Sequence, residues 1–153
     1  MPLIPTILIQ ELSRFMDSKS SSFQGFPGRE TVGQAWADAV DAYAAAIIPP
    51  STTSPACKTA LAGALAGMSS PNGALVVLPA GFTGYAAVLG GGMAPTFIAT
   101  PPPVPLNLSP AFSLGMSRAP AAEVIAQIAA LVDAWFRTGI AVPLIGGPSV
   151  PWS

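Results

Sequence analysis

The sequence of 153 residues contains no histidine, one cysteine and very few charged residues. Without histidine, Ser-His and Cys-His nucleophile systems, histidine acid-base catalysis and most zinc or iron sites are unavailable. The single cysteine, Cys57, cannot form a disulfide within the chain, which favours a reducing compartment. No base and no cation cluster accompanies it in the sequence, so we interpret Cys57 as a small core residue and not as a nucleophile.

Charge is the scarcest feature of the composition. Charged residues make up 8% of the chain, against about 25% in an average soluble protein, and the formal net charge is -1. Nucleic acid and anionic membrane surfaces need clustered positive charge, so we expect neither as a direct partner. Sparse surface charge promotes association, and free monomers rarely expose large apolar patches. We therefore expect other protein to cover much of the exterior.

A stretch without any charged residue runs from Thr59 to Ser117, which raises the question of a membrane span. A spanning helix needs about 20 consecutive apolar residues, whereas prolines interrupt this stretch repeatedly. Its longest piece without proline after Pro71, Ala80 to Ala94, is short and rich in glycine. We predict no membrane span. The N-terminus lacks the positive segment of a secretory signal, and we interpret it as mature protein.

Hydrophobic periodicity predicts an all-α fold, a small bundle of four to five short helices with extended proline-rich arms. The first helix is expected over about Pro5 to Asp17. The last helix is expected over about Pro120 to Thr138, with Gly139 as its C-cap. Two further helices lie between them.

Local signals mark the starts of these two helices. Residues 31–34, Thr-Val-Gly-Gln, fit a capping box, and an apolar stripe follows it. That stripe consists of Trp36, Val40, Tyr43 and Ile47. Ser54 followed by Pro55 begins the next helix, with the hydroxyl as N-cap and proline in the first turn. Its inner face is expected to consist of Cys57, Leu61, Leu65 and Met68.

The element at residues 75–89 leaves two alternatives open. Apolar residues recur there at spacings of three and four, which favours a helix, but Pro79 lies inside it and residues 74–78 could form a short strand. We favour a kinked or proline-started helix that ends at the glycines 90–92. These glycines lack the Lys-Ser/Thr ending of a phosphate-binding loop, so we interpret them as a helix stop.

Two segments are predicted to be extended arms. The sequence divides into a helical domain, 1–140, with an internal proline-rich connector at about 93–117, and an extended C-terminal arm, 141–153. Residues 101–105 are expected to adopt polyproline II. Such arms suit a symmetric assembly in which each subunit reaches across its neighbour. Trp152 is either disordered or seated in a pocket, and we favour the pocket because large aromatics are typical interface anchors. The expected partner-binding residues are Pro101, Pro102, Pro103, Leu144, Ile145, Val150, Pro151 and Trp152.

No catalytic, cofactor-binding or metal-binding residue is predicted. Asp38 and Asp41 lie three apart on a helix, but two ligands do not make a calcium site, so we interpret them as solvated carboxylates. The seven acidic residues offer no pair that favours glycosidase chemistry. We therefore expect no enzyme activity, no cofactor and no small-molecule substrate.

Three parts of the sequence resemble small Ala- and Pro-rich virion proteins of tailed bacteriophages. They are 40–43 through 48–53, 90–95 through 101–103, and 146–153. The resemblance implies a non-enzymatic structural component of a phage particle, at the tail or baseplate or at the head-to-tail junction. Its partners would be other virion proteins and copies of itself, assembled in the host cytoplasm. It brings no functional residue with it. The alternatives are a capsid decoration protein and a small membrane or surface protein.

Overall fold

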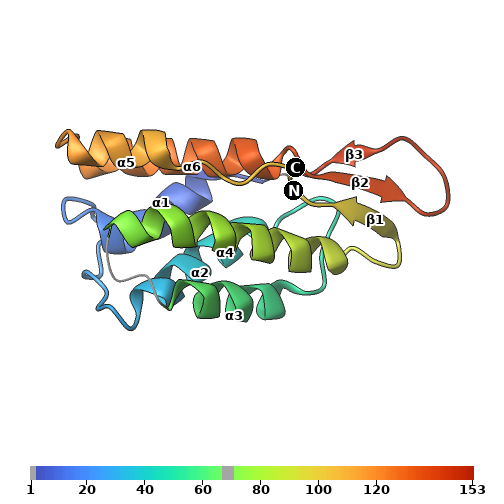
Figure 1. Cartoon of the computed structure of the whole chain (residues 1–153), viewed down its shortest axis with the longest axis horizontal. Helices are drawn as coiled ribbons and strands as arrows, with labels where there is room; N and C mark the ends of the chain where they lie inside the picture. Colours follow the sequence, from blue (N-terminus) through green and yellow to red (C-terminus); the bar gives the residue numbers. More distant parts are fainter. Residues whose placement is uncertain (1–2, 67–70) are drawn as a thin grey trace.

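Six helices and three short strands make up the part of the chain that this computed structural model describes, residues 3–66 and 71–153 (Figure 1). The helices are α1 (Pro5–Met16), α2 (Val32–Ala44), α3 (Ser54–Leu65), α4 (Pro71–Gly91), α5 (Ser109–Met116) and α6 (Ala121–Phe136). The strands are β1 (Phe97–Thr100), β2 (Ile140–Pro143) and β3 (Val150–Pro151). They form one antiparallel sheet in the order β1-β2-β3. The predicted mainly helical class is confirmed, but a purely all-α bundle is wrong because of this sheet.

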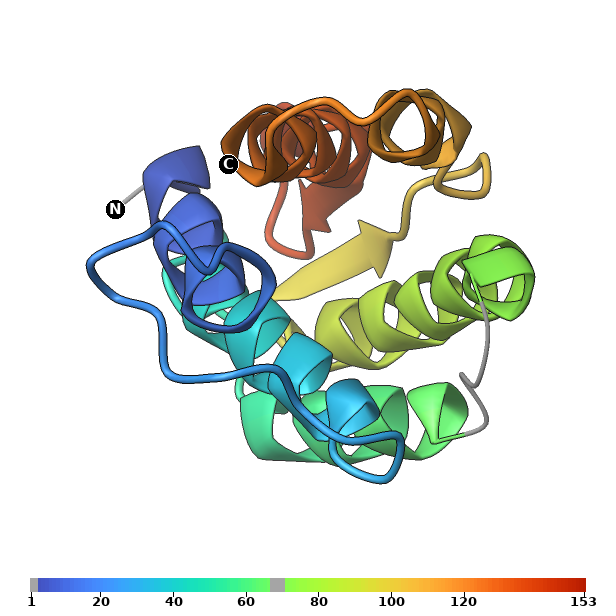
Figure 2. The ribbon, with the colours of Figure 1, turned by 90° about the vertical axis from the view of Figure 1, so that its left-hand side faces the viewer.

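The helices surround a common interior, which Figure 2 shows along the long axis of the molecule. α1 packs against α6 and α2, α2 packs against α3, and α3 packs against α4. An edge-to-face contact between Phe82 of α4 and Trp135 of α6, with ring centroids 6.0 Å apart, closes this arrangement. The sheet extends from one end of the helices, and the loop of residues 17–31 lies at the opposite end (Figure 1).

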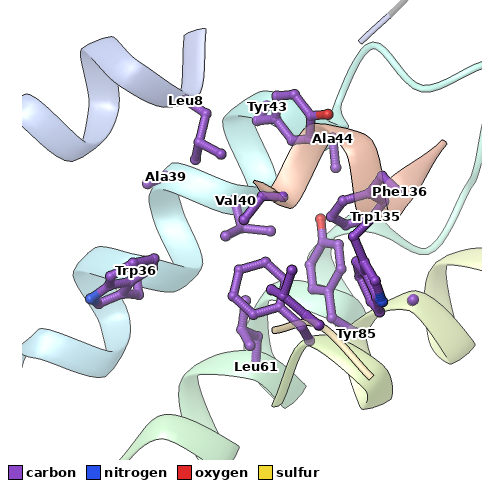
Figure 3. Packing of buried hydrophobic residues seen from close by; sticks show 14 of the residues in the cluster. Leu8, Trp36, Ala39, Val40, Tyr43, Ala44, Leu61, Tyr85, Trp135 and Phe136 are labelled. Atoms are coloured by element: carbon purple, nitrogen blue, oxygen red, sulfur yellow. The ribbon is translucent and has the colours of Figure 1, made fainter. Parts of the chain in front are cut away.

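Phe136 lies at the centre of the aromatic core. Its ring makes edge-to-face contacts with Tyr43 of α2 and Tyr85 of α4, at centroid distances of 5.7 and 6.2 Å. All three side chains are fully buried, and Figure 3 shows them together in the interior. Trp152, near the C-terminus, completes the group at 6.4 Å from Phe136. Because burial of large aromatic surface dominates core energetics, this cluster joins the helices to the C-terminal segment.

The first and last helices lie where their apolar spacing predicts them. α1 has Pro5 in its first turn, where the missing N–H costs nothing, and it buries Leu8 and Leu12. α6 covers most of the predicted range and buries one apolar face. The predicted C-cap at Gly139 is wrong, because Arg137 occupies the cap position. Gly139 has a different role, described below.

α2 begins without the predicted capping box. The hydroxyl of Thr31 donates to the carbonyl oxygen of Gly28 at 3.3 Å and accepts nothing from the helix. The side chain of Gln34 donates to Asp38 at 2.9 Å and does not reach back to the helix start. The helix is instead held by its buried stripe, since tertiary packing of an amphipathic face supplies most helical stability. Trp36, Val40, Tyr43 and Ile47 are all buried, as predicted.

α3 presents the predicted inner face, and Cys57, Leu61 and Leu65 are fully buried on it. Met68 lies outside the described residues. The interpretation of Cys57 as a core residue is confirmed, because its thiol is free and buried. Burial raises the pKa of the Cys57 thiol, so the reactive thiolate form is disfavoured.

The ambiguous element at 75–89 is helical throughout. It lies inside α4, which continues through Pro79 without a strand. Hydroxyl groups from the loop between α2 and α3 satisfy carbonyl oxygens at its C-terminal end. Ser51 donates to Leu89 at 2.6 Å, and Thr53 donates to Val88 at 2.8 Å. The last carbonyls of a helix lack partners within it, so this loop serves as the cap.

Both predicted arms fold onto their own chain. The connector at about 93–117 contains β1 and α5, neither of which was predicted. The indole N–H of Trp135 donates to the carbonyl oxygen of Val104 at 2.6 Å and ties the connector to α6. α5 begins with Ser109 and Pro110, as α3 begins with Ser54 and Pro55. The predicted N-cap at Ser54 is wrong, because Thr53 occupies the cap position of α3 and the helix starts one residue earlier than expected. The arm at 141–153 contains most of β2 and all of β3.

Candidate protein interface

The three-stranded sheet brings the two predicted arms together. β1 pairs with β2 so that Ile98 lies opposite Val142 and Thr100 lies opposite Ile140. β2 in turn pairs with β3, which places Pro151 opposite Ile140. Side chains alternate between the two faces of a sheet, so each strand presents one set outward and one inward.

The outer face of the sheet is apolar and exposed. Ile98 of β1 and both Ile140 and Val142 of β2 are exposed there. The hairpin between β2 and β3 adds Leu144 and Ile145, and the side chain of Ile145 is 98% exposed. We call these five residues the apolar sheet face. Residues 138–153 and 93–117 contain no charged side chain, so nothing charged on the sheet interrupts it.

The tip of the hairpin is shaped by two glycines. Gly146 and Gly147 have φ values of 80° and 139°, which disfavour any residue with a Cβ. The N–H of Leu144 donates to the carbonyl oxygen of Thr96 at 3.1 Å, just beyond the β1–β2 pairing. The loop between β2 and β3, red in Figure 1, projects away from the helices. Ile145 belongs to this loop.

Trp152 follows β3 directly and is fully buried. Its ring lies between two glycines, and a Cβ on Gly139 would come within 2.5 Å of the indole. A Cβ on Gly90 would meet the same ring at 3.3 Å. The backbone N–H of Trp152 donates to the carbonyl oxygen of Gly139 at 2.9 Å. At Gly139 the backbone approaches the indole too closely for a side chain, whereas at Gly90 a Cβ would make a tight contact.

The last residue is tied to the loop after α2. The N–H of Ile48 donates to Ser153 at 2.7 Å, and the N–H of Ser153 donates to Ile48 at 3.1 Å. This pair of backbone bonds fixes the C-terminal segment on its own chain. The predicted seat of Trp152 in a pocket is therefore found, but the pocket belongs to the same chain.

The structure separates the predicted partner-binding residues by exposure. Pro102 and Trp152 are buried, and Pro101 and Val150 are half-buried. The exposed members are Pro103, Leu144, Ile145 and Pro151. In this arrangement, Trp152 offers no accessible surface to a partner. The hairpin brings four of the eight together: Leu144, Ile145, Val150 and Pro151.

Sequence reasoning missed Ile98, Ile140 and Val142. Exposure alternates from one residue to the next along Phe97–Thr100 and Ile140–Pro143. This period of two is typical of a half-buried strand. Each strand is only four residues long and lies among prolines. Their pairing over about 40 residues of sequence carries no local signal.

A second apolar feature lies at the opposite end of the molecule. A hollow of about 380 Å³ is lined by Phe15, Met16, Phe26, Pro27, Val32 and Trp36. It adjoins a hollow of similar volume whose rim carries the ion pair of Arg14 and Glu11, at 2.8 Å. Phe26 belongs to both and is 70% exposed. We call the first the aromatic hollow.

An ion pair near the surface joins α3 to α2. Lys58 contacts Asp38 at 2.7 Å, so this carboxylate is not simply solvated. Asp38 and Asp41 lie on α2. No group of three or more His, Cys, Asp or Glu residues that could hold a metal ion occurs in residues 3–66 and 71–153.

α4 bears on the question of a membrane span. Within the described residues, Gly73–Gly91 is long and apolar enough to cross a membrane by length and composition. The same test is passed by core helices, and α4 packs against α3 and β1. The absence of a membrane span therefore stays a prediction.

No protein-family model matches the chain, and no curated protein or solved structure matches it either.

Proposed function

We propose that the chain is a non-enzymatic structural component of a tailed-phage virion, at the tail or baseplate or at the head-to-tail junction. It assembles in the host cytoplasm and contacts other virion proteins and copies of itself. The apolar sheet face is the surface through which it does so. No catalytic step and no cofactor is part of this proposal.

The observation that carries the proposal is the exposure of the apolar sheet face. The aliphatic side chains of Ile98, Val142 and Ile145 are exposed to solvent in the isolated chain. Contiguous exposed apolar surface on a small protein marks an interaction site more often than a free surface. With charged residues at 8% of the sequence, the chain has little polar surface with which to surround that face.

The resemblance to phage virion proteins supplies the class of assembly. It rests on residues 40–53, 90–103 and 146–153, and the last of these includes part of the hairpin and all of β3. An apolar contact surface on a neutral protein suits permanent assembly, because obligate interfaces are more apolar than transient ones.

The proposal is tested on particles released from a culture that produces the native protein. After density-gradient purification, quantitative mass spectrometry should find the chain in the particle fraction in fixed stoichiometry. A far larger copy number would favour capsid decoration. Recovery in membranes, with release only by detergent, would favour the membrane alternative. Either result contradicts a position in the tail or neck.

A substitution on the sheet links incorporation to the proposed surface. Ile98→Lys places a charge on the apolar sheet face and should remove the chain from purified particles. Val104→Lys is the matched control, because Val104 is also an exposed β-branched residue but lies between β1 and α5. Equal incorporation of both variants would show that the sheet face is not the contact surface.

A further inference from the structure

We propose that copies of this chain associate head to tail, with the hairpin tip of one copy seated in the aromatic hollow of the next. The inference rests on the proposed structural function, because it names the partner of the apolar sheet face. The occupant is a second copy of the chain, and the residue that enters the hollow is Ile145.

The hairpin tip has the properties of an inserting group. Ile145 is the most exposed of the large apolar side chains in the described part of the chain, at 98%. The preceding residue is held in place, because the N–H of Leu144 donates to the carbonyl oxygen of Thr96 at 3.1 Å. A side chain presented on a constrained turn loses little conformational freedom on binding, which favours affinity.

The aromatic hollow has the properties of a receiving site. It is an open depression of about 380 Å³, so a side chain of another copy can reach its walls directly. Phe15 and Trp36 form part of its wall through an edge-to-face contact at 6.2 Å. Phe26 stands at its edge with most of its ring in water. Aromatic walls and a solvent-exposed apolar edge suit a branched aliphatic side chain.

The two surfaces match in charge as well as in polarity. None of the six lining residues of the aromatic hollow is charged, and no residue from 138 to 153 is charged. The net charge of -1 leaves little repulsion between copies. Removing these surfaces from water therefore desolvates no ionised side chain at their centre.

Their positions determine the kind of assembly. The hairpin and the loop of residues 17–31, which carries Phe26, lie at opposite ends of the long axis (Figure 1). In the proposed head-to-tail arrangement, a pair of copies makes one contact and leaves one hairpin tip and one hollow unoccupied. Contacts of this heterologous type continue from copy to copy and produce a ring or a filament.

The test uses two substitutions that each disable one half of the contact. Ile145→Asp removes the inserting group and keeps the hollow, whereas Phe26→Asp alters the hollow and keeps the hairpin. Sedimentation of the purified full chain should show oligomers for the wild type. Each variant alone should associate at least about tenfold more weakly. An equimolar mixture should form dimers, because one intact contact remains between the two variants.

Several results would overturn the inference. They are a monomeric wild type at about 100 µM, unchanged association of either variant, and a mixture that stays monomeric. Circular dichroism and Tm of each variant check the fold, and Val104→Asp should assemble like the wild type. As a second measurement, Ile145→Cys and Phe26→Cys chains should cross-link to each other on oxidation, whereas each alone should not.

The inference and the proposed function fail in different ways. If the chain is present in particles but the variant mixture does not pair, head-to-tail association is wrong and the virion role stands. If the mixture pairs but the native protein is absent from particles, the virion role is wrong and the association stands.

Discussion

The phenol of Tyr43 donates a 2.6 Å hydrogen bond to Asp133 and joins α2 to α6 across 90 residues of sequence. The same carboxylate accepts from Arg137, with Nε and Oδ2 2.8 Å apart. Arg137 also donates to the carbonyl oxygen of Leu3 at 3.0 Å. Three separate parts of the chain therefore meet at this ion pair, whose carboxylate is only partly open to water.

The hydroxyl groups of the two tyrosines should differ in their contribution to stability. Tyr43→Phe removes a hydrogen bond to a charged group and should lower the free energy of unfolding by about 1–2 kcal/mol. The hydroxyl of Tyr85 is buried and has no hydrogen-bond partner among the residues described. Tyr85→Phe is the matched control and should leave stability unchanged or raise it, because no bond is lost.

Urea unfolding at neutral pH measures both variants. Equal m-values are required, so that the midpoints report stability and not a change in surface exposed on unfolding. A larger loss for Tyr85→Phe than for Tyr43→Phe would mean that the Tyr85 hydroxyl has a partner that the structure does not reveal.

Stability should fall at alkaline pH because of these two tyrosines. Burial is the main cause that raises the pKa of both, and the hydrogen bond and charge of Asp133 raise the pKa of Tyr43 further. The unfolded chain ionises its tyrosines near pH 10, while the folded chain resists ionisation. Their contribution is therefore complete below about pH 10 and decreases as the pH rises above it.

The absence of other tyrosines makes this measurement simple. The sequence contains two tyrosines, so tyrosinate absorbance reports on Tyr43 and Tyr85 alone. It should appear together with unfolding and not before it. The free energy of unfolding should depend less on pH above about 10 in the double Tyr→Phe variant. A residual fall is expected from Cys57, whose pKa burial also raises. Tyrosinate absorbance in a chain that remains folded would contradict the prediction.

Gly139→Ala should disrupt the seat of Trp152. The added Cβ would come within 2.5 Å of the indole, so the ring or the backbone must move. Overpacking of this kind costs about 1–3 kcal/mol. Gly91→Ala is the matched control, because a Cβ there meets nothing within 4 Å. Since Gly91 ends α4, alanine should be neutral or stabilising.

Thermal unfolding and tryptophan emission follow this pair of variants. The Gly139→Ala chain should unfold at lower temperature and show emission shifted to longer wavelength, as water reaches Trp152. Unchanged emission with a lowered Tm would mean that the strain is released elsewhere. A Gly91→Ala variant as unstable as Gly139→Ala would remove the close approach as the explanation.

The helices could be predicted because their signals are local. The stripes of α1, α2, α3 and α6 recur at three and four residues, and proline marks the starts of α1 and α3. α5 carries the same Ser-Pro start, but the prolines before it favoured a connector. The Thr31 capping box failed because a short motif does not determine which way the hydroxyl points.

The sheet and the seat of Trp152 could not be predicted in the same way. β1 and β2 are short, and the pairing of Ile98 with Val142 depends on α5 and α6 folding between them. The apolar composition of residues 141–153 indicates that this segment must be buried against something. It does not indicate that Gly90 and Gly139 of the same chain form the seat of Trp152. The low charge predicts an exterior that needs cover, whereas only the pairing of β1 with β2 places Ile98 and Val142 on one face.

Removal of the Trp152 side chain should therefore act on folding before it acts on assembly. Trp152 is fully buried and lies beside Phe136 at 6.4 Å, so truncation leaves a large cavity in the core. Trp152→Ala should lower the free energy of unfolding of the isolated chain by about 3–5 kcal/mol. Deletion of residues 141–153 should be at least as damaging, because β1 also loses its partner strand.

Ile145→Ala provides the matched control for this prediction. Its side chain is 98% exposed on the same segment, so the free energy of unfolding should change by less than about 0.5 kcal/mol. Denaturant unfolding below the concentration at which the chain associates separates folding from assembly. If Trp152→Ala keeps wild-type stability there and only association is lost, the indole belongs to an interface between copies, and its burial within one chain is wrong.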